Sequence, residues 1–163
     1  YFLKCNSYQE HILMQNGNLN TIWDILGTVP DPEIPVISVV ELGVIRNVEF
    51  IENEYVISVT PTYSGCPAVK TFQDDIKTQL KANNINNFKI KIVYKPAWTT
   101  NWMTKKTKKK LKEYGISPPE DIAQCPQCNS TNIELISEFG ATACKSLYKC
   151  SDCLEPFEHF KCI

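Results

Sequence analysis

The sequence predicts an α+β fold in which a small α/β domain is followed by a C-terminal zinc ribbon. Two observations support this prediction. Over the first two thirds of the chain, segments rich in β-branched residues alternate with segments whose apolar residues recur at helical spacing. Near the C-terminus, two Cys-x-x-Cys pairs are separated by residues 129–149, a spacing typical of a zinc ribbon.

The elements of the α/β domain follow from the apolar pattern and from the residues that interrupt it. Asn20 is expected to cap the first helix, and Pro30 is expected to end it. Pro67 fits the first position of the second helix, and Gly115 fits the end of the last one. The expected elements are a helix over 20–29, hairpin strands over 44–51 and 55–60, a helix over 67–82, a strand over 88–94 and a helix over 104–114.

A proline-rich step at residues 117–119 marks the predicted domain boundary. We expect the α/β domain to span 18–117 and the ribbon to span 118–163. The ribbon strands are expected over 133–137, 146–149 and 156–160. Residues 1–17 are expected to be a tail: residues 1–13 show no clear period, and Met14 stands just before a convincing domain opening. We therefore expect Met14 to be the natural start, which would make the preceding residues a non-native or upstream tail.

The predicted metal ligands are the thiolates of Cys125, Cys128, Cys150 and Cys153. Each pair can close on one cation from a tight turn, and together the pairs complete a tetrahedron of four sulfurs. Such a site leaves no position for water, so one zinc per chain would be structural and would hold a lobe with little core of its own. Disulfides are the alternative, but the spacing favours metal in a reducing compartment, and we expect a cytoplasmic protein.

Composition excludes several classes of function. Hydrophobic residues make up 43% of the sequence and charged residues 21%, as is usual for a globular protein. The formal net charge of -1 gives no general case for nucleic-acid binding. No apolar run approaches the length of a membrane span, and no secretory leader is expected.

Cys66 is the most interesting single residue for chemistry. Gly65 before it allows close backbone approach, and the helix after it offers free N–H groups and a positive dipole end. Such a place favours a thiolate, which could bind iron, attack an electrophile or pass on a cluster. The alternative is a buried cysteine that acts as a small apolar plug.

Three acidic residues stand near the start of the domain, Asp31, Glu33 and Glu41. Paired carboxylates can share a proton or bind a hard cation, but capping and solvated loop roles are the favoured interpretation. The two histidines, His11 and His159, belong to no recognisable nucleophile–base pattern. A conventional hydrolase is therefore not expected.

Three further features remain open between a functional and a structural role. Trp98 and Trp102 could form a partner-binding rim or could cover the α/β core. Cys144 and Cys162 could join an iron–sulfur centre, although ordinary packed cysteines are favoured. A basic run could dock an acidic protein, although a solvated helix face is favoured. Its members are Lys105, Lys106, Lys108, Lys109, Lys110 and Lys112.

These motifs resemble a known family. Residues 31–35 (DPEIP), 38–43 (SVVELG) and 62–67 (TYSGCP) resemble the domain of metal–sulfur cluster assembly proteins such as SufT. The tail resembles the PaaD family, which supplies component D of the bacterial phenylacetyl-CoA epoxidase system. Its motifs are residues 125–128 (CPQC), 137–145 (SEFGATACK) and 150–162 (CSDCLEPFEHFKC).

The resemblance implies an accessory protein of phenylacetate degradation with no catalytic residues of its own. It implies assistance in iron–sulfur cluster assembly, with the reductase component of the epoxidase as the expected client. By position, Cys66 matches the reactive cysteine of the assembly domain, and Asp31 and Glu33 match its acidic motif. Cys66 would hold iron or a cluster transiently. The expected partners are other epoxidase components or iron–sulfur assembly proteins, with neither nucleic acid nor membrane.

The alternative function is that of a structural, non-catalytic subunit of the epoxidase complex. The sequence leaves open the client, the oligomeric state, including a homodimer, and whether Cys144 or Cys162 contacts metal.

Overall fold

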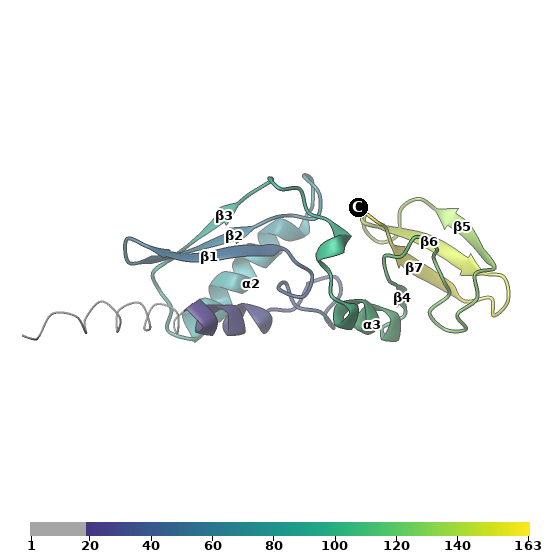
Figure 1. The fold of residues 1–163 in the computed structure, drawn as a ribbon, viewed down its shortest axis with the longest axis horizontal. Helices are drawn as coiled ribbons and strands as arrows, with labels where there is room; N and C mark the ends of the chain where they lie inside the picture. The colour runs from purple at the N-terminus through teal and green to yellow at the C-terminus, as the bar shows by residue number, and fades with distance from the viewer. Residues whose placement is uncertain (1–18) are drawn as a thin grey trace, which may run out of the picture.

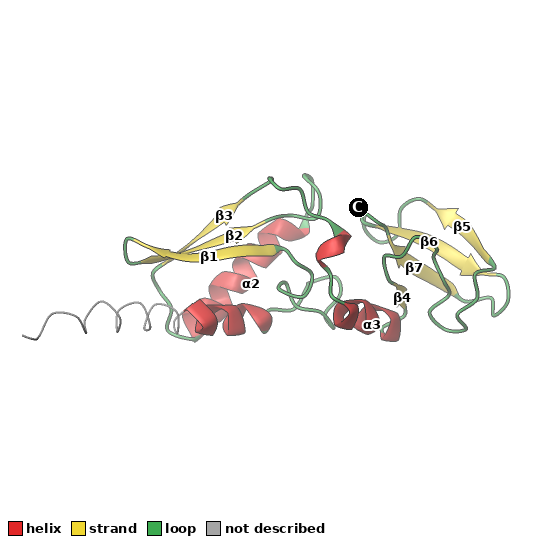
Figure 2. Cartoon of the chain, viewed as in Figure 1, coloured by secondary structure: helices red, strands yellow, loops and turns green. Residues whose placement is uncertain are grey.

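The computed structural model describes residues 19–163, which form two β-sheets placed side by side along the molecule (Figure 1). The first sheet has the order β1-β2-β3, and the second has the order β4-β7-β6-β5. Helices pack on the first sheet, whereas the second carries loops (Figure 2). The mixed α+β fold predicted from the sequence is confirmed, and the predicted tail 1–17 lies outside the described residues.

The first sheet begins with a hairpin of β1 (Ile45–Ile51) and β2 (Glu54–Val59). Its turn has two residues, Glu52 and Asn53, with φ of 49° and 66°, as tight hairpin turns require. β3 (Phe88–Ile92) then pairs parallel with β2. A parallel neighbour needs a crossover connection, and α2 (Ala68–Ala82) provides it.

One face of α2 is buried through residues at helical spacing, which are Ala68, Phe72, Ile76 and Leu80. They share the main core with Ile57 and Val59 of β2 and with Ile22 and Leu26 of the helical residues 19–27. Full burial of a side chain such as Phe72 stabilises the fold by about 1.5–3 kcal/mol. The helical spacing of apolar residues in the sequence therefore predicts the buried face of α2 correctly.

Two helix ends differ from the prediction. Asn20 lies inside the helical residues 19–27 instead of capping them, because Leu19 before it is already helical. That helix ends three residues before Pro30, where the Thr28 N–H donates to the Ile25 carbonyl at 3.0 Å. Pro67 has helical φ and ψ but stands at the N-cap of α2, one position earlier than expected.

α3 (Lys105–Glu113) follows a 3-10 turn, η1 (Thr100–Trp102). The Thr104 hydroxyl caps α3 by accepting from the Thr107 N–H at 3.1 Å, and Gly115, with φ of 95°, follows its end. Lys110 of α3 places its Nζ 2.7 Å and 2.9 Å from the two carboxylate oxygens of Glu41. Within the part of the chain that the structure describes, no helix is both long and apolar enough to cross a bilayer.

Several lysines of the basic run have partners within the protein. Lys108 donates to the Pro119 carbonyl at 2.9 Å, and Lys109 lies 3.6 Å from Glu113. Lys105, Lys106 and Lys109 are exposed, in keeping with the favoured interpretation of a solvated helix face, and the choice between that role and docking of an acidic protein stays a prediction.

The second sheet contains β5 (Ile133–Ser137), β6 (Lys145–Cys150) and β7 (Pro156–Phe160), close to their predicted bounds. A further strand, β4 (Ile116–Ser117), pairs parallel with β7 and was not predicted, because two residues carry no alternation. β4 falls within the range 18–117 yet belongs to the second sheet. The domain division at residue 117 remains a prediction.

Trp98 joins the two sheets. Its side chain is 3% exposed, and its indole Nε1–H donates to the Leu42 carbonyl at 3.0 Å. Its ring centroid lies 5.9 Å from that of Phe160 in β7, and both residues belong to the main core. The proposed partner-binding rim is therefore wrong for Trp98, which covers the core. Trp102 is half-buried, with the Arg46 guanidinium carbon 3.4 Å from its ring centroid.

We expect Trp98→Ala to lower the free energy of unfolding by about 3–5 kcal/mol, because it removes a large ring from the joint between the sheets. Trp98→Phe should cost less, about 1–3 kcal/mol, because it leaves the buried Leu42 carbonyl without its donor. Urea denaturation of the metal-loaded protein measures both. Tyr94→Ala is the matched control, since Tyr94 is 59% exposed. Equal stability of Trp98→Ala and the control would contradict the role of Trp98 as the joint.

Candidate functional site

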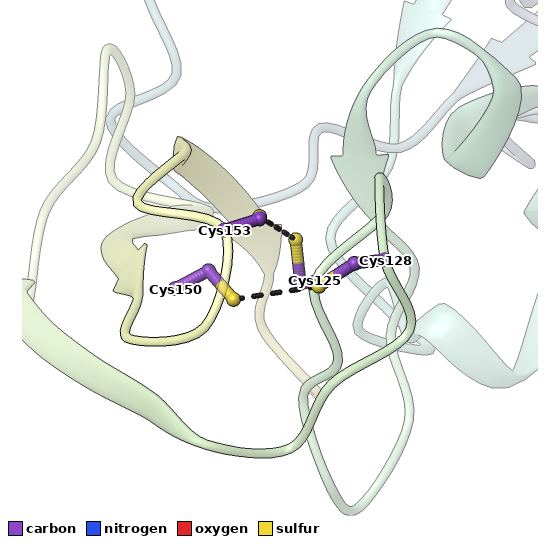
Figure 3. A group of neighbouring side chains, drawn as sticks. All are labelled: Cys125, Cys128, Cys150 and Cys153. Atoms are coloured by element: carbon purple, nitrogen blue, oxygen red, sulfur yellow. Dashed lines mark hydrogen bonds between the residues drawn. The ribbon is translucent and has the colours of Figure 1, made fainter.

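The four ribbon cysteines converge on one point (Figure 3). Their sulfurs all lie within 4.8 Å of one another, and none is in a disulfide. The sulfur–sulfur distance is 3.5 Å both between Cys125 and Cys153 and between Cys128 and Cys150. Zinc–sulfur bonds of about 2.3 Å in a tetrahedron place the sulfurs about 3.8 Å apart. The donor set therefore fits a zinc ion with little rearrangement.

Two similar turns present these thiols. In the first, the Cys125 N–H donates to the Ser130 carbonyl at 2.9 Å, and Asn129 has φ of 62°. In the second, the Cys150 N–H donates to the Glu155 carbonyl at 2.9 Å, and Leu154 has φ of 66°. One cysteine of each pair is buried, in a small core with Phe157, and the other is exposed. The core of this lobe is small, so bonds to a metal would provide much of its stability.

Crowding separates the proton affinities of these thiols. Backbone hydrogen bonds from Cys153 and Asp152 lower the pKa of Cys150 to about 7. Cys153 receives a backbone hydrogen bond from Glu155 that lowers its pKa, but desolvation and the neighbouring thiols raise that pKa to about 12. Four thiolates this close together repel one another unless a cation lies between them. A bound zinc ion would supply that positive charge.

Cys144 and Cys162 stand apart from this four-sulfur group among residues 19–163. Cys144 is buried in the main core, and its sulfur lies 3.0 Å from the Thr142 hydroxyl. Cys162 is exposed near the C-terminus. The favoured interpretation of ordinary packing is consistent with the burial of Cys144 but not with the exposure of Cys162.

Cys66 lies in the turn that leads into α2. Its N–H donates to the Tyr63 carbonyl at 3.1 Å, and its carbonyl accepts from the Val69 N–H at 3.3 Å. Pro67 at the N-cap gives no side-chain cap, and the first turn of α2 holds no acidic residue. The thiol is half-buried and packs against the main core. Cys66 is therefore partly accessible, beside the N–H groups of the first turn of α2, which itself holds no acidic residue.

The acidic motif lies in a tight turn. One oxygen of Asp31 accepts from the backbone N–H groups of Glu33, at 2.9 Å, and Ile34, at 2.6 Å. Asp31 is only 4% exposed, and burial raises its pKa. Burial also raises the pKa of Glu33, and the charge of Asp31 raises it further. Glu41 instead forms reciprocal hydrogen bonds with Ser38 and has a lowered pKa, so it caps a turn as the favoured interpretation had it.

The ribbon contributes residues that sequence reasoning missed. Lys145 has a side chain 4% exposed, and its Nζ lies 2.6 Å from a carboxylate oxygen of Glu158. Burial raises the pKa values of Asp31 and Glu33, and the positive charge of Lys145 partly offsets that rise. Lys145 therefore faces the acidic motif. No pattern marked it, because a lysine at a strand end is normally solvated.

The zinc site predicts that Cys125→Ser or Cys150→Ser loses the metal together with the ribbon structure, because the lobe has little other core. The unchanged protein should contain about one zinc per chain. Elemental analysis and circular dichroism measure both quantities. Cys162→Ser is the control and should keep its metal. Iron in place of zinc in the anaerobically purified protein would contradict a structural zinc site.

The Asp31 turn predicts a difference between two substitutions. Asp31→Ala should cost about 1–3 kcal/mol, because two backbone N–H groups lose their acceptor. Asp31→Asn keeps an acceptor and removes the buried charge. Burial raises the pKa of Asp31 in the folded protein, so ionisation of Asp31 opposes folding. At pH values above that pKa, the Asp31→Asn variant should therefore be more stable than wild type. This advantage should shrink as the pH falls through the folded pKa. Urea unfolding at several pH values would refute this account if Asn and Ala behaved alike.

Comparisons with known proteins agree with this two-part construction. Residues 19–85 match the family model described as "Iron-sulfur cluster assembly protein". Residues 112–161 match the one described as "PaaD zinc beta ribbon domain". The ribbon match and the four-sulfur group together indicate a bound metal such as zinc.

A crystal structure of a domain of unknown function, DUF59, from Bacillus anthracis superposes with a TM-score of 0.57 at 30% identity, covering 61% of this chain and 96% of that one. The chain is also 45% identical over 154 residues to a protein of Escherichia coli (strain K12) named as the putative D component of 1,2-phenylacetyl-CoA epoxidase. That match covers 89% of this chain and 93% of the relative. The resemblance inferred from the motifs is confirmed, and the chain belongs to the PaaD family, that of the putative D component of phenylacetyl-CoA epoxidase.

Proposed function

We propose that this protein is a non-catalytic maturation factor that assists iron–sulfur cluster assembly for a phenylacetyl-CoA epoxidase, with its reductase component as the client. The supporting observation is the place of Cys66. It is a half-buried thiol at the entrance to α2, inside the stretch that matches the cluster assembly family. Asp31 and Glu33 are proposed to belong to the same site.

The proposed chemistry is ligand exchange. The Cys66 thiolate forms one bond to an iron ion or to a cluster iron, with both electrons supplied by sulfur. A client thiolate then forms its own bond to that iron while the Cys66–iron bond breaks. No electron leaves the metal in this step, and the proton lost by the client thiol offsets the one that Cys66 regains. Partial exposure suits such a carrier, because both donor and client must reach the sulfur.

The absence of a suitable acid–base set supports a non-catalytic role. Within residues 19–163 the one histidine, His159, is buried, and its Nδ1 lies 3.1 Å from the Ser117 hydroxyl. Burial lowers the pKa of His159, so it is neutral at physiological pH. A neutral, buried imidazole in the ribbon sheet is suited to a structural role. His159 is also far from Cys66 in sequence.

The zinc ribbon is proposed to hold one structural zinc and to contribute the surface that meets other components of the epoxidase system or of the assembly machinery. A structural subunit remains the competing function. The match to a protein named as an epoxidase subunit supports this structural-subunit function. A complex with the oxygenase that survives purification would favour the subunit, whereas transient association would favour the maturation factor.

The test is complementation in a strain that lacks this protein. Cys66→Ser should leave the reductase with a reduced iron–sulfur content, measured by iron and sulfide analysis and by absorption spectroscopy of the purified reductase. The Cys162→Ser variant is the matched control, since it changes an exposed thiol outside the proposed site. Full restoration of the cluster by Cys66→Ser would show the ligand-exchange proposal to be wrong.

A further inference from the structure

Residues of the ribbon reach the surroundings of Cys66. Burial raises the pKa of Tyr63, which precedes Cys66 in the same turn. The negative charges that raise it further belong to Cys66, Cys144 and Glu33, so all three groups lie near one phenol. Two of them come from the first part of the chain, and Cys144 comes from the ribbon. Figure 1 shows the start of α2 at the end of the first sheet that faces the second sheet.

Packing gives an independent indication. Cys144 is 6% exposed and belongs to the main core, although it precedes β6 of the ribbon sheet. Cys66 packs against that same core. The Thr142 hydroxyl lies 3.0 Å from the Cys144 sulfur, and Thr142 also lowers the pKa of Glu33, so it faces both side chains. A chain of contacts thus runs from the acidic motif to the ribbon thiol.

A buried ion pair holds Cys144 in this position. Lys145, the next residue, is 3% exposed and pairs with Glu158 of β7 at 2.6 Å. The Ala141 N–H donates to the other carboxylate oxygen of Glu158, and the Gly140 N–H donates to the Lys145 carbonyl at 2.8 Å. A Cβ on Gly140 would lie 3.3 Å from the Lys145 Cβ and closer still to Glu158. The loop that carries Cys144 is therefore tightly fixed.

We propose that Cys144 is the second thiol ligand of the Cys66 site, which thereby spans both parts of the chain and takes a thiophilic divalent cation such as Fe²⁺. Two thiolates, with Glu33 and the Tyr63 hydroxyl nearby, form a soft donor set with room for ligands from outside. This deepens the proposed function and rests on it for the identity of the cargo.

The site is open where the ribbon site is closed. Among the described residues, the ribbon cysteines are the one group of three or more His, Cys, Asp and Glu ligand atoms within 4.8 Å of one another. Cys66 and Glu33 must therefore move toward Cys144 to enclose a cation. Glu33 is exposed on its turn and can move at little cost, whereas Cys144 cannot. A cation held by an adaptable set dissociates more readily than one in a preformed tetrahedron, as a carrier needs.

The test uses Co²⁺ as the probe on full-length, zinc-loaded protein under anaerobic conditions, with zinc content measured throughout. Wild type should bind one further Co²⁺ with thiolate-to-metal charge-transfer absorption. Cys66→Ser and Cys144→Ser should each reduce that absorption to about half, because each removes one of two thiolates. Cys162→Ser is the control and should match wild type. An absorption unchanged by Cys144→Ser would overturn the proposal.

A second measurement needs no substitution in the core. A short bifunctional thiol reagent applied to zinc-loaded wild type should bridge Cys66 and Cys144, identified as a cross-linked peptide by mass spectrometry. A failure to recover that peptide while Cys162 is modified would overturn the two-thiol site. The outcomes separate the two proposals. If Cys144→Ser binds Co²⁺ as wild type does while Cys66→Ser fails to complement, the maturation role stands without the second thiol.

Discussion

The contact between Trp98 and the ribbon is the constraint on which the rest of the structure depends. Trp98 packs against Phe160 of β7 and donates to the Leu42 carbonyl, so one ring links the second sheet to the turn that leads into β1 of the first. Gly43 in that turn has φ of 81°, and a Cβ there would lie 3.2 Å from the Trp102 Cβ. Because interiors are close-packed, a joint of this kind fixes orientation as well as contact. The ribbon is therefore held in a fixed orientation relative to the first sheet.

This orientation explains the buried charges. Removing an ammonium group from water is costly unless it is paired, and Lys145 is paired with Glu158 while facing the acidic turn. Asp31 is in turn compensated by two backbone N–H groups. The ribbon thus supplies a positive charge that faces the acidic turn, in addition to the two N–H groups within that turn. The acidic motif and the ribbon loop form one electrostatic unit, although more than 100 residues separate them in sequence.

The two sulfur sites differ in a way that suits different tasks. In the ribbon, four thiols within 4.8 Å lie in two rigid turns and fit a permanent metal. At the start of α2, Cys66 is partly exposed beside uncapped helix N–H groups, with Cys144 held near it by the Lys145–Glu158 pair. A filled coordination shell resists exchange, whereas an incomplete one permits it. The combination is consistent with a structural metal in one place and a transient cargo in the other.

The amino-acid sequence by itself determined the fold class, the helices and strands with strong periods, the four-cysteine cluster and the family, because each depends on local spacing or on motifs. It identified Cys66, Asp31 and Glu33 as candidates, whose roles remain proposals. It missed β4, which owes its existence to pairing with β7. It also missed Lys145, and it could not place Trp98 or Cys144. These were decided by tertiary structure alone, because burial and charge pairing across the two sheets depend on contacts between distant residues, which no local pattern encodes.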